Sequence, residues 1–532
     1  MIRSTIEFLE MLWTDLTQEK ISRIVFTSCC LLFGRLLWAI YLYPLYFSPY
    51  LALPQAKLTS EQQRKSWIGI MLEPLQNGDK VLEYVDNTPN QGIFRALNLL
   101  NKEVLVITRP EFIKEIPQTN VYDFRKMANV QNFMKVLLGD GLLTVDGEEH
   151  KQQRKALNPA FSAKHVQQLY SVFYSKTREM VSCIKEEMDT SHAQQGIAVD
   201  ITAWVNRAAL DIIGTAALGI DFNSLADPTN ELSRAYQAIF EPDNTSNIIF
   251  LLSIFFTTWT VKLLPLKKAR EVRAGSAFVK RYIEEVMTRK VRENDDNKDT
   301  YKDILSVASQ YGKLSTNDLV NQARTFLVAG HETTATAMQW ALYTLTRPEN
   351  LQVQQRLRDE IHKQLPPLDS EQEISAYTLG KNMPYLDAVS KECLRIYGPS
   401  PFSRRTAVKD TVLCGIPIRK GTNFLIPNWA INRSKKLWGE RAREFDPERW
   451  LHGNEAPNGG ADALAFQTFS SGTRGCIGKS FALAEFKIML AGLVGSFEIA
   501  KVADEKEVET EWAIIARIYN GFKVDLKPVS NW

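Results

Sequence analysis

One short stretch, FSSGTRGCIG at residues 469–478, constrains the fold of this chain more than any other part of the sequence. It places Cys476 in a glycine-rich bend, with Arg474 two residues before it and a helix-forming segment of small residues directly after it. A bend that leads into a helix N-terminus supplies the N–H groups and positive charge that a thiolate needs at neutral pH. The glycines at 472, 475 and 478 allow positive φ angles and leave room for a flat group against the backbone. A haem with a cysteine axial ligand fits this description.

These residues match the pattern F-x-x-G-x-R-x-C-x-G, and the stretch strongly resembles the haem-binding loop of the cytochromes P-450, the haem-thiolate monooxygenases. The resemblance implies that Cys476 ligates the iron of haem b, iron protoporphyrin IX. It also implies that Phe469, Arg474 and Gly478 belong to the cofactor site. The alternative is an inert, buried cysteine, which is the usual fate of a lone one. Three more motifs of the same family accompany the loop in the expected order and favour the haem site.

The composition of the 532 residues, 45% hydrophobic and 23% charged, is that of an ordinary globular protein. Length alone suggests several domains, but the motifs run from Asp146 to Gly478 and favour one large catalytic domain. The net charge of +3 is too near zero to imply a nucleic-acid partner. The six cysteines show no C-x-x-C pair and no disulfide-framework spacing, so we expect reduced thiols that face the cytosol. The six histidines do not cluster into a metal site.

Residues 24–43 form an apolar run of 20 residues with one charge, Arg35, which is about the span of a bilayer core. Aromatic residues stand near one end of the run, where a membrane interface favours them, and Pro44 is predicted to stop the helix. We therefore predict a retained transmembrane anchor. A cleaved signal peptide is the alternative, but the run is too long and no A-x-A-like site follows it. The cytosolic placement of the catalytic domain rests on the family resemblance more than on the charges.

Helical periodicity dominates residues 162–388, whereas short β-like runs occur at 104–107 and 407–425. This mixture predicts a mainly α domain with a small β region, and the resemblance implies the cytochrome P-450 fold as a single large domain behind the anchor. The predicted segments are an extramembrane N-terminus (1–23), the anchor (24–43), a proline-rich hinge (44–54) and the haem-thiolate catalytic domain (55–532). A second apolar run at 248–264 is either another transmembrane helix or, as we prefer, a patch that dips into the bilayer beside a substrate entrance.

A long helix is predicted between Ser315, a good N-cap, and Pro348, a good stop. Apolar residues recur between them with a period of about 3.6 residues, and the helix would be about 45–50 Å long. Gly330, Thr333 and Thr334 fall on one face of this helix. A glycine beside hydroxyls that bond back to carbonyls marks a place where helices open or bend. An ordinary helix with two threonines is the alternative.

The segment AGHETT at residues 329–334 resembles the family motif A-G-x-[DE]-T-[TS] that lies over the haem. The resemblance implies that Gly330 leaves room for dioxygen and that Thr333 hydrogen-bonds the bound oxygen and a water. It also implies that Glu332 is an acid linked to bulk solvent. An alcohol–carboxylate relay suits a reaction that must receive two protons. His331 is expected to be a bystander on another face of the helix.

Two motifs resemble the scaffold of the family. Glu392 and Arg395 in KECLR lie three residues apart on one helix face, and FDPERW, which contains Arg449, resembles the P-E-R-F segment. The resemblance implies that these three residues form a buried network that locks the meander below the haem. On the surface, a pair with this spacing would stabilise a helix by only about 0.2–0.5 kcal/mol. The role assigned to the network is structural.

Several basic residues are assigned to the haem propionates by resemblance. The segment DGEEHKQQR resembles the W/H-x-x-x-R helix beside a propionate, with His150 in place of the usual Trp and Arg154 as the arginine. Arg154, Arg474 and Arg405 would neutralise the two propionates by charge-assisted hydrogen bonds. Arg404 competes with Arg405 for the third position. A solvated surface charge is the alternative for each arginine.

The resemblance implies a monooxygenase that inserts one atom of dioxygen into an apolar organic substrate. Electrons would come from NADPH through NADPH–cytochrome P-450 reductase, with cytochrome b5 as an optional further partner. The expected location is the endoplasmic reticulum membrane, spanned once. The sequence of the loop at 469–478 is most similar to that of microsomal family members from fungal natural-product pathways. This similarity implies a terpenoid, polyketide or alkaloid substrate.

Two other functions stay open: a haem-thiolate isomerase or dehydratase that needs no reductase, and a non-enzymatic haem sensor. Such isomerases tend to lose the helix threonine, whereas Thr333 is present, and a sensor needs no proton relay. Lys151, Lys155 and Lys479 are expected to gather into a basic patch that steers docking of the reductase. A solvated lysine-rich face without a partner is the alternative.

Overall fold

The computed structural model describes residues 18–56, 77–119, 121–190, 197–240, 267–293, 303–311, 314–368, 370, 378–451, 463–503, 506–529 and 532. The chain divides into two compact units, 1–106 and 107–532. The apolar run predicted at 248–264 lies outside the described residues, as does most of the predicted N-terminal segment 1–23. The predicted start of the catalytic domain at residue 55 stays a prediction.

In the first unit, α2 (Gln18–Leu37) continues directly into the π-helical segment η1 (Trp38–Phe47). Residues Ser22–Phe47 are long and apolar enough to cross a membrane, and their apolar window is not buried. The helix therefore covers the predicted anchor at 24–43. The prediction that Pro44 stops the helix was wrong, because Pro44 lies inside η1 and the helix ends at Phe47. A proline removes one hydrogen bond and crowds the preceding turn, and the wider π-helical turn accommodates both effects.

The rest of the first unit is built around two strands, β1 (Ile93–Leu97) and β2 (Glu103–Ile107), preceded by α4 (Gly78–Asn87) and joined through η2 (Leu99–Asn101). The fully buried Arg95 on β1 pairs with Glu103 on β2 and donates to the carbonyl of Pro44. The backbone N–H of Arg95 also donates to the carbonyl of Pro54 at 2.8 Å. Hydrogen bonds therefore tie both ends of the predicted hinge, 44–54, to β1.

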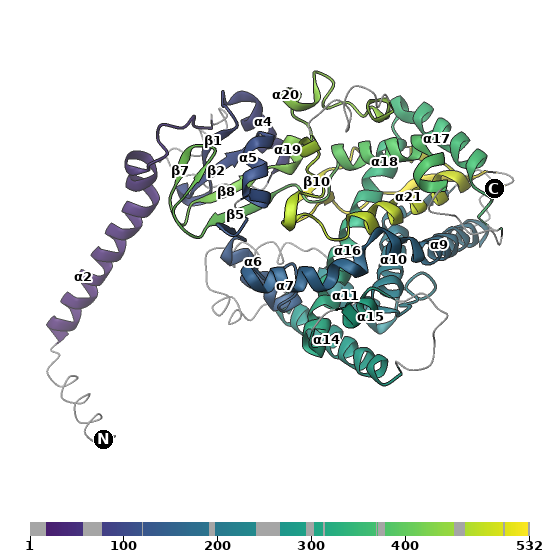
Figure 1. Cartoon of the computed structure of the whole chain (residues 1–532), viewed down its shortest axis with the longest axis horizontal. Coiled ribbons are helices and arrows are strands. Elements are labelled where there is room, and N and C mark those ends of the chain that lie inside the picture. Colours follow the sequence, from purple (N-terminus) through teal and green to yellow (C-terminus); the bar gives the residue numbers. More distant parts are fainter. Residues whose placement is uncertain are drawn as a thin grey trace. The chain divides into compact units, whose positions relative to one another are not determined.

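The second unit is mainly helical, and its longest helix is α16 (Thr316–Leu345). This helix starts with a capping box between Ser315 and Asp318 and ends before Pro348, as predicted. Its 30 residues make it about 45 Å long. The helices that pack against it include α10 (Ile201–Ile213), α14 (Lys267–Glu293), α18 (Pro384–Ile396) and α21 (Lys479–Ser496) (Figure 1).

The second unit has further described helices besides these. They are α5 (Pro110–Lys114), α6 (Ala128–Leu138), α7 (Gly147–Leu157), α8 (Ala163–Gln168), α9 (Tyr170–Thr190), α11 (Glu231–Phe240), α15 (Ile304–Tyr311), α17 (Leu351–Gln364), α19 (Asn428–Ile431) and α20 (Lys435–Trp438). Short 3₁₀ or π-helical turns lie between them. Buried apolar side chains of α9, α10, α16, α18 and α21 belong to one core cluster. From residue 334 to 345 every side chain of α16 is buried, so this half is a core helix.

The strands of the second unit form small antiparallel groups. They are β3 (Phe124–Arg125), β4 (Ile197–Val199), β5 (Ser403–Ala407), β6 (Thr411–Leu413), β7 (Ile416–Ile418), β8 (Asn423–Ile426), β9 (Phe497–Lys501), β10 (Thr510–Trp512), β11 (Ala516–Ile518) and β12 (Val524–Pro528). β5 pairs with β3 and β8, and β12 pairs with β4 and β9, while β6–β7 and β10–β11 form two-stranded pairs. The predicted fold class, mainly α with a small β region, is confirmed.

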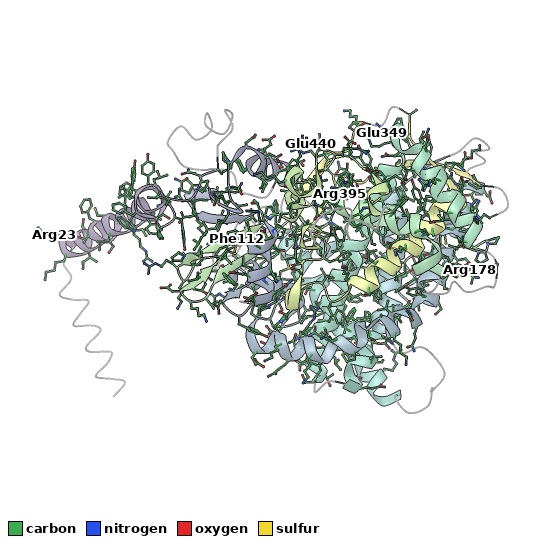
Figure 2. All side chains as sticks on the ribbon, turned by 45° about the horizontal axis from the view of Figure 1, so that its top comes forward. Arg23, Phe112, Arg178, Glu349, Arg395 and Glu440 are labelled. Carbon is green, nitrogen blue, oxygen red and sulfur yellow. The ribbon has the colours of Figure 1, made fainter. Side chains whose placement is uncertain are left out.

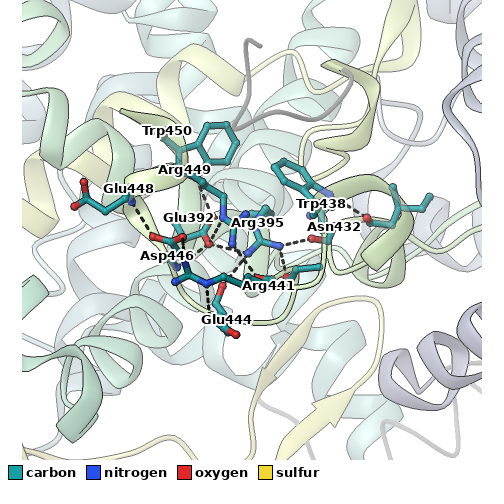
Figure 3. A network of polar contacts seen from close by, with 12 residues as sticks. Glu392, Arg395, Asn432, Trp438, Arg441, Glu444, Asp446, Glu448, Arg449 and Trp450 are labelled. Carbon is teal, nitrogen blue, oxygen red and sulfur yellow. Dashed lines mark hydrogen bonds and ion pairs between the residues drawn. The ribbon is translucent and has the colours of Figure 1, made fainter. Parts of the chain in front are cut away.

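A buried polar network joins α18 to the 3₁₀ turn η8 (Pro447–Trp450), as predicted (Figure 3). The Glu392 carboxylate accepts from Nη2 of Arg395 at 2.7 Å, from Nε of Arg449 at 2.9 Å and from the indole N–H of Trp450 at 2.8 Å. Although burial acts to raise it, the bonds from Arg395 hold the pKa of Glu392 below its usual value. Arg395 lies in the interior of the unit and donates to the carbonyl of Asn432 at 2.6 Å (Figure 2). The network therefore ties the ends of several loops to one helix.

Candidate active site

A cavity of about 470 Å³ lies in the second unit, and residues of α6, α16, β5 and the loop before α21 line it. Most of the lining side chains are apolar, among them Met127, Met134, Phe161 and Phe326. Cys476 is the one cysteine in the described residues that lines the cavity. The cavity therefore combines an apolar interior with one thiol and a limited set of polar groups.

The cysteine loop is closed by two backbone hydrogen bonds. The N–H of Cys476 donates to the carbonyl of Phe469 at 2.9 Å, and the N–H of Gly475 donates to that of Gly472 at 3.0 Å. α21 then begins at Lys479. Of the three glycines, Gly472 has a φ of 66°, and a β carbon there would lie 2.4 Å from the carbonyl oxygen of Pro117. A left-handed backbone against a neighbouring turn thus requires glycine at this position.

The other two glycines have negative φ, −63° at Gly475 and −85° at Gly478, which residues other than glycine also adopt. A β carbon at Gly478 would lie 4.0 Å from the sulfur of Cys476, which is an ordinary contact. Backbone strain therefore does not require glycine there. The absence of a side chain at Gly478 instead leaves open surface beside the Cys476 thiol, and both residues line the cavity.

The electrostatic environment of Cys476 acts in two directions. Burial raises the pKa of the thiol, whereas the N–H of Gly478 and the charges of Arg154 and Lys479 lower it. Arg154, on α7, donates from Nη1 to the carbonyl of Gly475 at 2.6 Å. Its guanidinium therefore lies against the peptide next to the thiol and is absent from the cavity lining, although it was predicted at a propionate.

Three cations, Lys126, Arg405 and Arg474, line one part of the cavity. The carboxylate at this place is Asp146, whose Oδ1 lies 2.7 Å from Nη1 of Arg474. Burial lowers the pKa of Lys126 to about 7, with Asp146 acting against the shift and Arg474 and Arg405 adding to it. Burial likewise lowers the pKa of Arg405 to about 10, and Arg474 adds to it. Three cations face one carboxylate here, so positive charge is in excess. These residues therefore fit a ligand that carries two carboxylates, and the two propionates of haem are such a pair.

Lys126 was missed by the sequence analysis, because one lysine between β3 and α6 belongs to no motif. Its ammonium donates to the carbonyls of Val145 at 2.8 Å and Leu142 at 3.1 Å. Its backbone N–H donates to Oδ2 of Asp146 at 3.1 Å. The sequence contains no local signal that brings residue 126 next to residue 474, and only the tertiary structure places it there.

His150 and Arg404 differ from their neighbours in this cluster. His150, on α7, is buried, and burial lowers its pKa to about 3, with Arg474 and Lys126 adding to the shift. Its imidazole is therefore neutral at pH 7. Arg404 lines the cavity over the ring of Phe402, and burial lowers its pKa to about 10. The charges of Arg474 and Asp146 act on Arg405 but not on Arg404, which favours Arg405 for the position that the sequence left open.

Gly330, Thr333 and Thr334 of α16 line the cavity together, as their spacing predicted. The Thr333 hydroxyl donates to the carbonyl of Ala329 at 2.6 Å, which is the predicted back-bond. A β carbon at Gly330 would lie 2.5 Å from Cδ1 of Ile213, so this glycine lets α10 approach α16 closely.

The other two residues of the helix motif lie off the cavity lining. Burial raises the pKa of Glu332 to about 6, with Arg517 opposing the shift and Glu511 adding to it. Glu332 keeps a half-buried side chain and thus some access to solvent. His331 is buried, with Nε2 2.9 Å from the carbonyl of Asn206 and its ring edge-on to Tyr236. The prediction that His331 lies on another face is confirmed.

Comparisons with known proteins agree with this geometry. The family model described as Cytochrome P450 matches residues 60–525. The chain is 37% identical over 514 residues to the cytochrome P450 monooxygenase sphH of Aspergillus fumigatus, covering 94% of this chain and 92% of the relative. It is 35% identical over 523 residues to the cytochrome P450 monooxygenase FSL4 of Gibberella zeae, covering 93% and 91%. It is 31% identical over 550 residues to FUM15 of Gibberella moniliformis, with the same coverage.

Proposed function

The chain belongs to the cytochrome P450 family, whose members are monooxygenases that use haem with cysteine-thiolate ligation, and from this membership we propose that Cys476 is the axial ligand. When bound, haem supplies the activation of dioxygen with two electrons, so that one oxygen atom enters the substrate and the other leaves as water. The observation that carries the proposal is the shared cavity. Cys476 lines it together with Thr333 of α16 and the cationic cluster of Lys126, Arg405 and Arg474.

The residues around the cavity have separable roles in holding the cofactor. Arg405, Arg474 and Lys126 neutralise the propionates, and Asp146 orients Arg474 through its ion pair. His150 is a neutral neighbour of this cluster that can donate one hydrogen bond. Arg154 stabilises the thiolate from the Gly475 side, and Phe469 and Gly478 form the surface of the loop beside the sulfur. This division assigns Arg154 to the thiolate more than to a propionate.

Proton delivery is proposed for Thr333 and Glu332. The hydroxyl of Thr333 donates to the carbonyl of Ala329, so its oxygen is available to accept a hydrogen bond from a water in the cavity. Glu332 has a pKa of about 6 and a half-buried side chain, and a carboxyl with these properties exchanges protons with solvent near neutral pH. The pair therefore provides the two stations of an alcohol–carboxylate relay.

The proposed substrate is an apolar secondary metabolite, such as a terpenoid, polyketide or alkaloid. Apolar side chains of α6 and α16, including Val130, Met134 and Phe326, support this class. Similarity to fungal cytochrome P450 monooxygenases supports a place in secondary metabolism. The electron donor proposed is NADPH–cytochrome P-450 reductase, with cytochrome b5 as an optional partner. The exposed apolar helix Ser22–Phe47 supports single-pass anchoring in the endoplasmic reticulum, with a cytosolic catalytic domain.

The ligand assignment is tested by the spectrum of the reduced, CO-bound protein. Wild type should absorb at the Soret position that is specific for thiolate ligation, and Cys476→Ala should lose it. A matched control is Cys393→Ala, since Cys393 is a buried core thiol on α18 that does not line the cavity. A thiolate CO spectrum in Cys476→Ala would contradict the assignment. NADPH consumption with reductase, tied to product formation, separates a monooxygenase from an isomerase and from a sensor.

A further inference from the structure

A fully buried carboxyl group lies behind the cavity, on the helix that follows the cysteine loop. Glu485 on α21 has no exposed surface, and its Oε2 accepts a hydrogen bond from the hydroxyl of Thr334 on α16 at 3.1 Å. Its Oε1 is buried and has no hydrogen-bond partner in the described part of the chain. No described cation forms an ion pair with it. Burial of an unpaired carboxylate is costly, so this group requires an explanation.

The carboxyl avoids that cost by remaining protonated. Burial raises the pKa of Glu485 to about 8, and the bond from Thr334 acts against the shift. At pH 7 the group is therefore mainly a neutral acid, which can donate one hydrogen bond and accept another. The Thr334 hydroxyl can also do both, so the pair holds together with either partner as the donor.

The bond joins the two helices that carry the opposing parts of the site. α21 follows Cys476, and α16 carries Thr333 directly before Thr334. Among the described residues, this is the one hydrogen bond between α16 and α21. One turn earlier on α16, Gly330 packs closely against Ile213 of α10. A rotation of α16 about its axis is thus opposed by tight packing on the α10 side and by a directional polar contact on the α21 side.

We propose that Glu485 is a positioning residue for α16: its hydrogen bond holds Thr334 and thereby sets the direction in which Thr333 faces the cavity. This inference rests on the proposed function of the site. Glu485 itself does not line the cavity, so it acts through Thr334 and is not a catalytic residue. The role assigned is the angular register of α16 relative to the loop that carries the thiolate.

A space-filling role and a positioning role of Glu485 predict different effects of an apolar replacement on the site. An apolar side chain of similar length, as in Glu485→Met, removes a buried polar atom that has no partner. The change also leaves the buried Thr334 hydroxyl without its Glu485 partner, which lowers stability whatever the role of the acid. If the acid only filled space, the site would be unaffected. If the acid positions Thr334, the same change leaves the protein folded but alters the surroundings of a ligand in the cavity.

The test uses the full chain with haem and carbon monoxide as the probe, since the C–O stretching frequency reports hydrogen bonds and polarity beside the ligand. Glu485→Gln keeps a neutral hydrogen-bonding group and should match wild type. Glu485→Met and Thr334→Val should both shift or broaden the C–O band, and the double variant should add nothing further. The control is Thr344→Val, a buried threonine of α16 whose hydroxyl bonds to the carbonyl of Trp340 in its own helix at 2.7 Å.

Two further measurements separate the outcomes. Infrared spectroscopy of wild type at pH 7 should show the band of a protonated, buried carboxyl, and Glu485→Gln should lose it. Unchanged C–O bands in Glu485→Met and Thr334→Val would overturn the proposal, as would additive shifts in the double variant. Unfolding or loss of haem in Glu485→Met would assign Glu485 to the scaffold and also overturn it. Failure of the proposed function is distinguishable, because wild type itself would then lack the thiolate CO spectrum.

Discussion

The clearest quantitative test of the scaffold compares two ion pairs that differ mainly in burial. Glu392–Arg395 and Arg441–Glu444 are both Arg–Glu pairs at i, i+3, and both have an N–O distance of 2.7 Å. Their environments are opposite: the side chains of the first pair are 0% and 0% exposed, and those of the second are 64% and 59% exposed. The perturbations are Glu392→Gln and Glu444→Gln, which remove one negative charge each and keep the side-chain volume.

The magnitudes follow from this difference. In Glu392→Gln the guanidinium of Arg395 stays buried without a counter-charge. The amide keeps one acceptor oxygen, and its NH₂ group cannot accept, so either Arg449, which bonds Oε1, or Trp450, which bonds Oε2, loses its acceptor. Breaking a buried pair in this way costs about 3–5 kcal/mol, whereas an exposed pair contributes about 0–1 kcal/mol. A loss of that size is a large part of a total stability of roughly 5–15 kcal/mol.

The assay is urea unfolding of the full chain, followed by far-ultraviolet circular dichroism and by the thiolate Soret band. The change in free energy is taken from the shift of the midpoint and the slope. Glu392→Gln should lower the midpoint strongly and lose the Soret band first, because Asn432, whose carbonyl accepts from Arg395, also bonds the Gln467 N–H and the Thr468 hydroxyl directly before the cysteine loop. A loss below about 1 kcal/mol, equal to that of Glu444→Gln, would refute the buried network.

Three further predictions concern the site. Thr333→Ala should keep haem and substrate binding but divert electrons to peroxide, and an unchanged ratio of product to NADPH would contradict the relay. Lys126, with a pKa of about 7, loses its charge as the pH rises above 7, and a bound dianion favours the charged form. Haem affinity should therefore fall by up to about tenfold per pH unit above 7, measured as transfer to an acceptor globin; the same slope in Lys126→Gln would exclude this origin. Changing Lys151 and Lys155 to Glu should slow reduction by reductase at low salt but spare peroxide-driven turnover, and equal loss in both assays would end the docking hypothesis. Lys479, which was predicted with them, stays unchanged because it also lowers the pKa of Cys476.

The residues predicted correctly from the sequence belong to local patterns. The Ser315 cap and Pro348 define α16, and the order of Gly330, Thr333 and Thr334 places them on one face whatever surrounds the helix. The pattern of the cysteine loop likewise places its thiol just before a helix N-terminus. These features depend on hydrogen bonds and periodicities that span only a few residues, so the sequence carries them in full.

Backbone conformation was predicted less well wherever neighbours decide it. Pro44 lies within a helix, because a local change to a π-helical turn outweighed the intrinsic preference of proline to end one. The assignment of Arg154 to a propionate stays a prediction; its guanidinium contacts the carbonyl of Gly475. A motif predicts which residue is present and leaves open which of two nearby acceptors it reaches.

By itself, the sequence determined the family, the ligand-bearing loop, the long helix and the network of Glu392 with its arginines. Only the tertiary structure decided the partners that come from distant parts of the chain: Lys126 beside Arg474, Ile213 in the space that Gly330 leaves, and Glu485 under Thr334. None of these contacts follows from a periodic pattern in the sequence. An isolated lysine or glutamate is by default expected to be a solvated surface charge. Burial changes their chemistry, and burial is a property of the packed fold rather than of any segment.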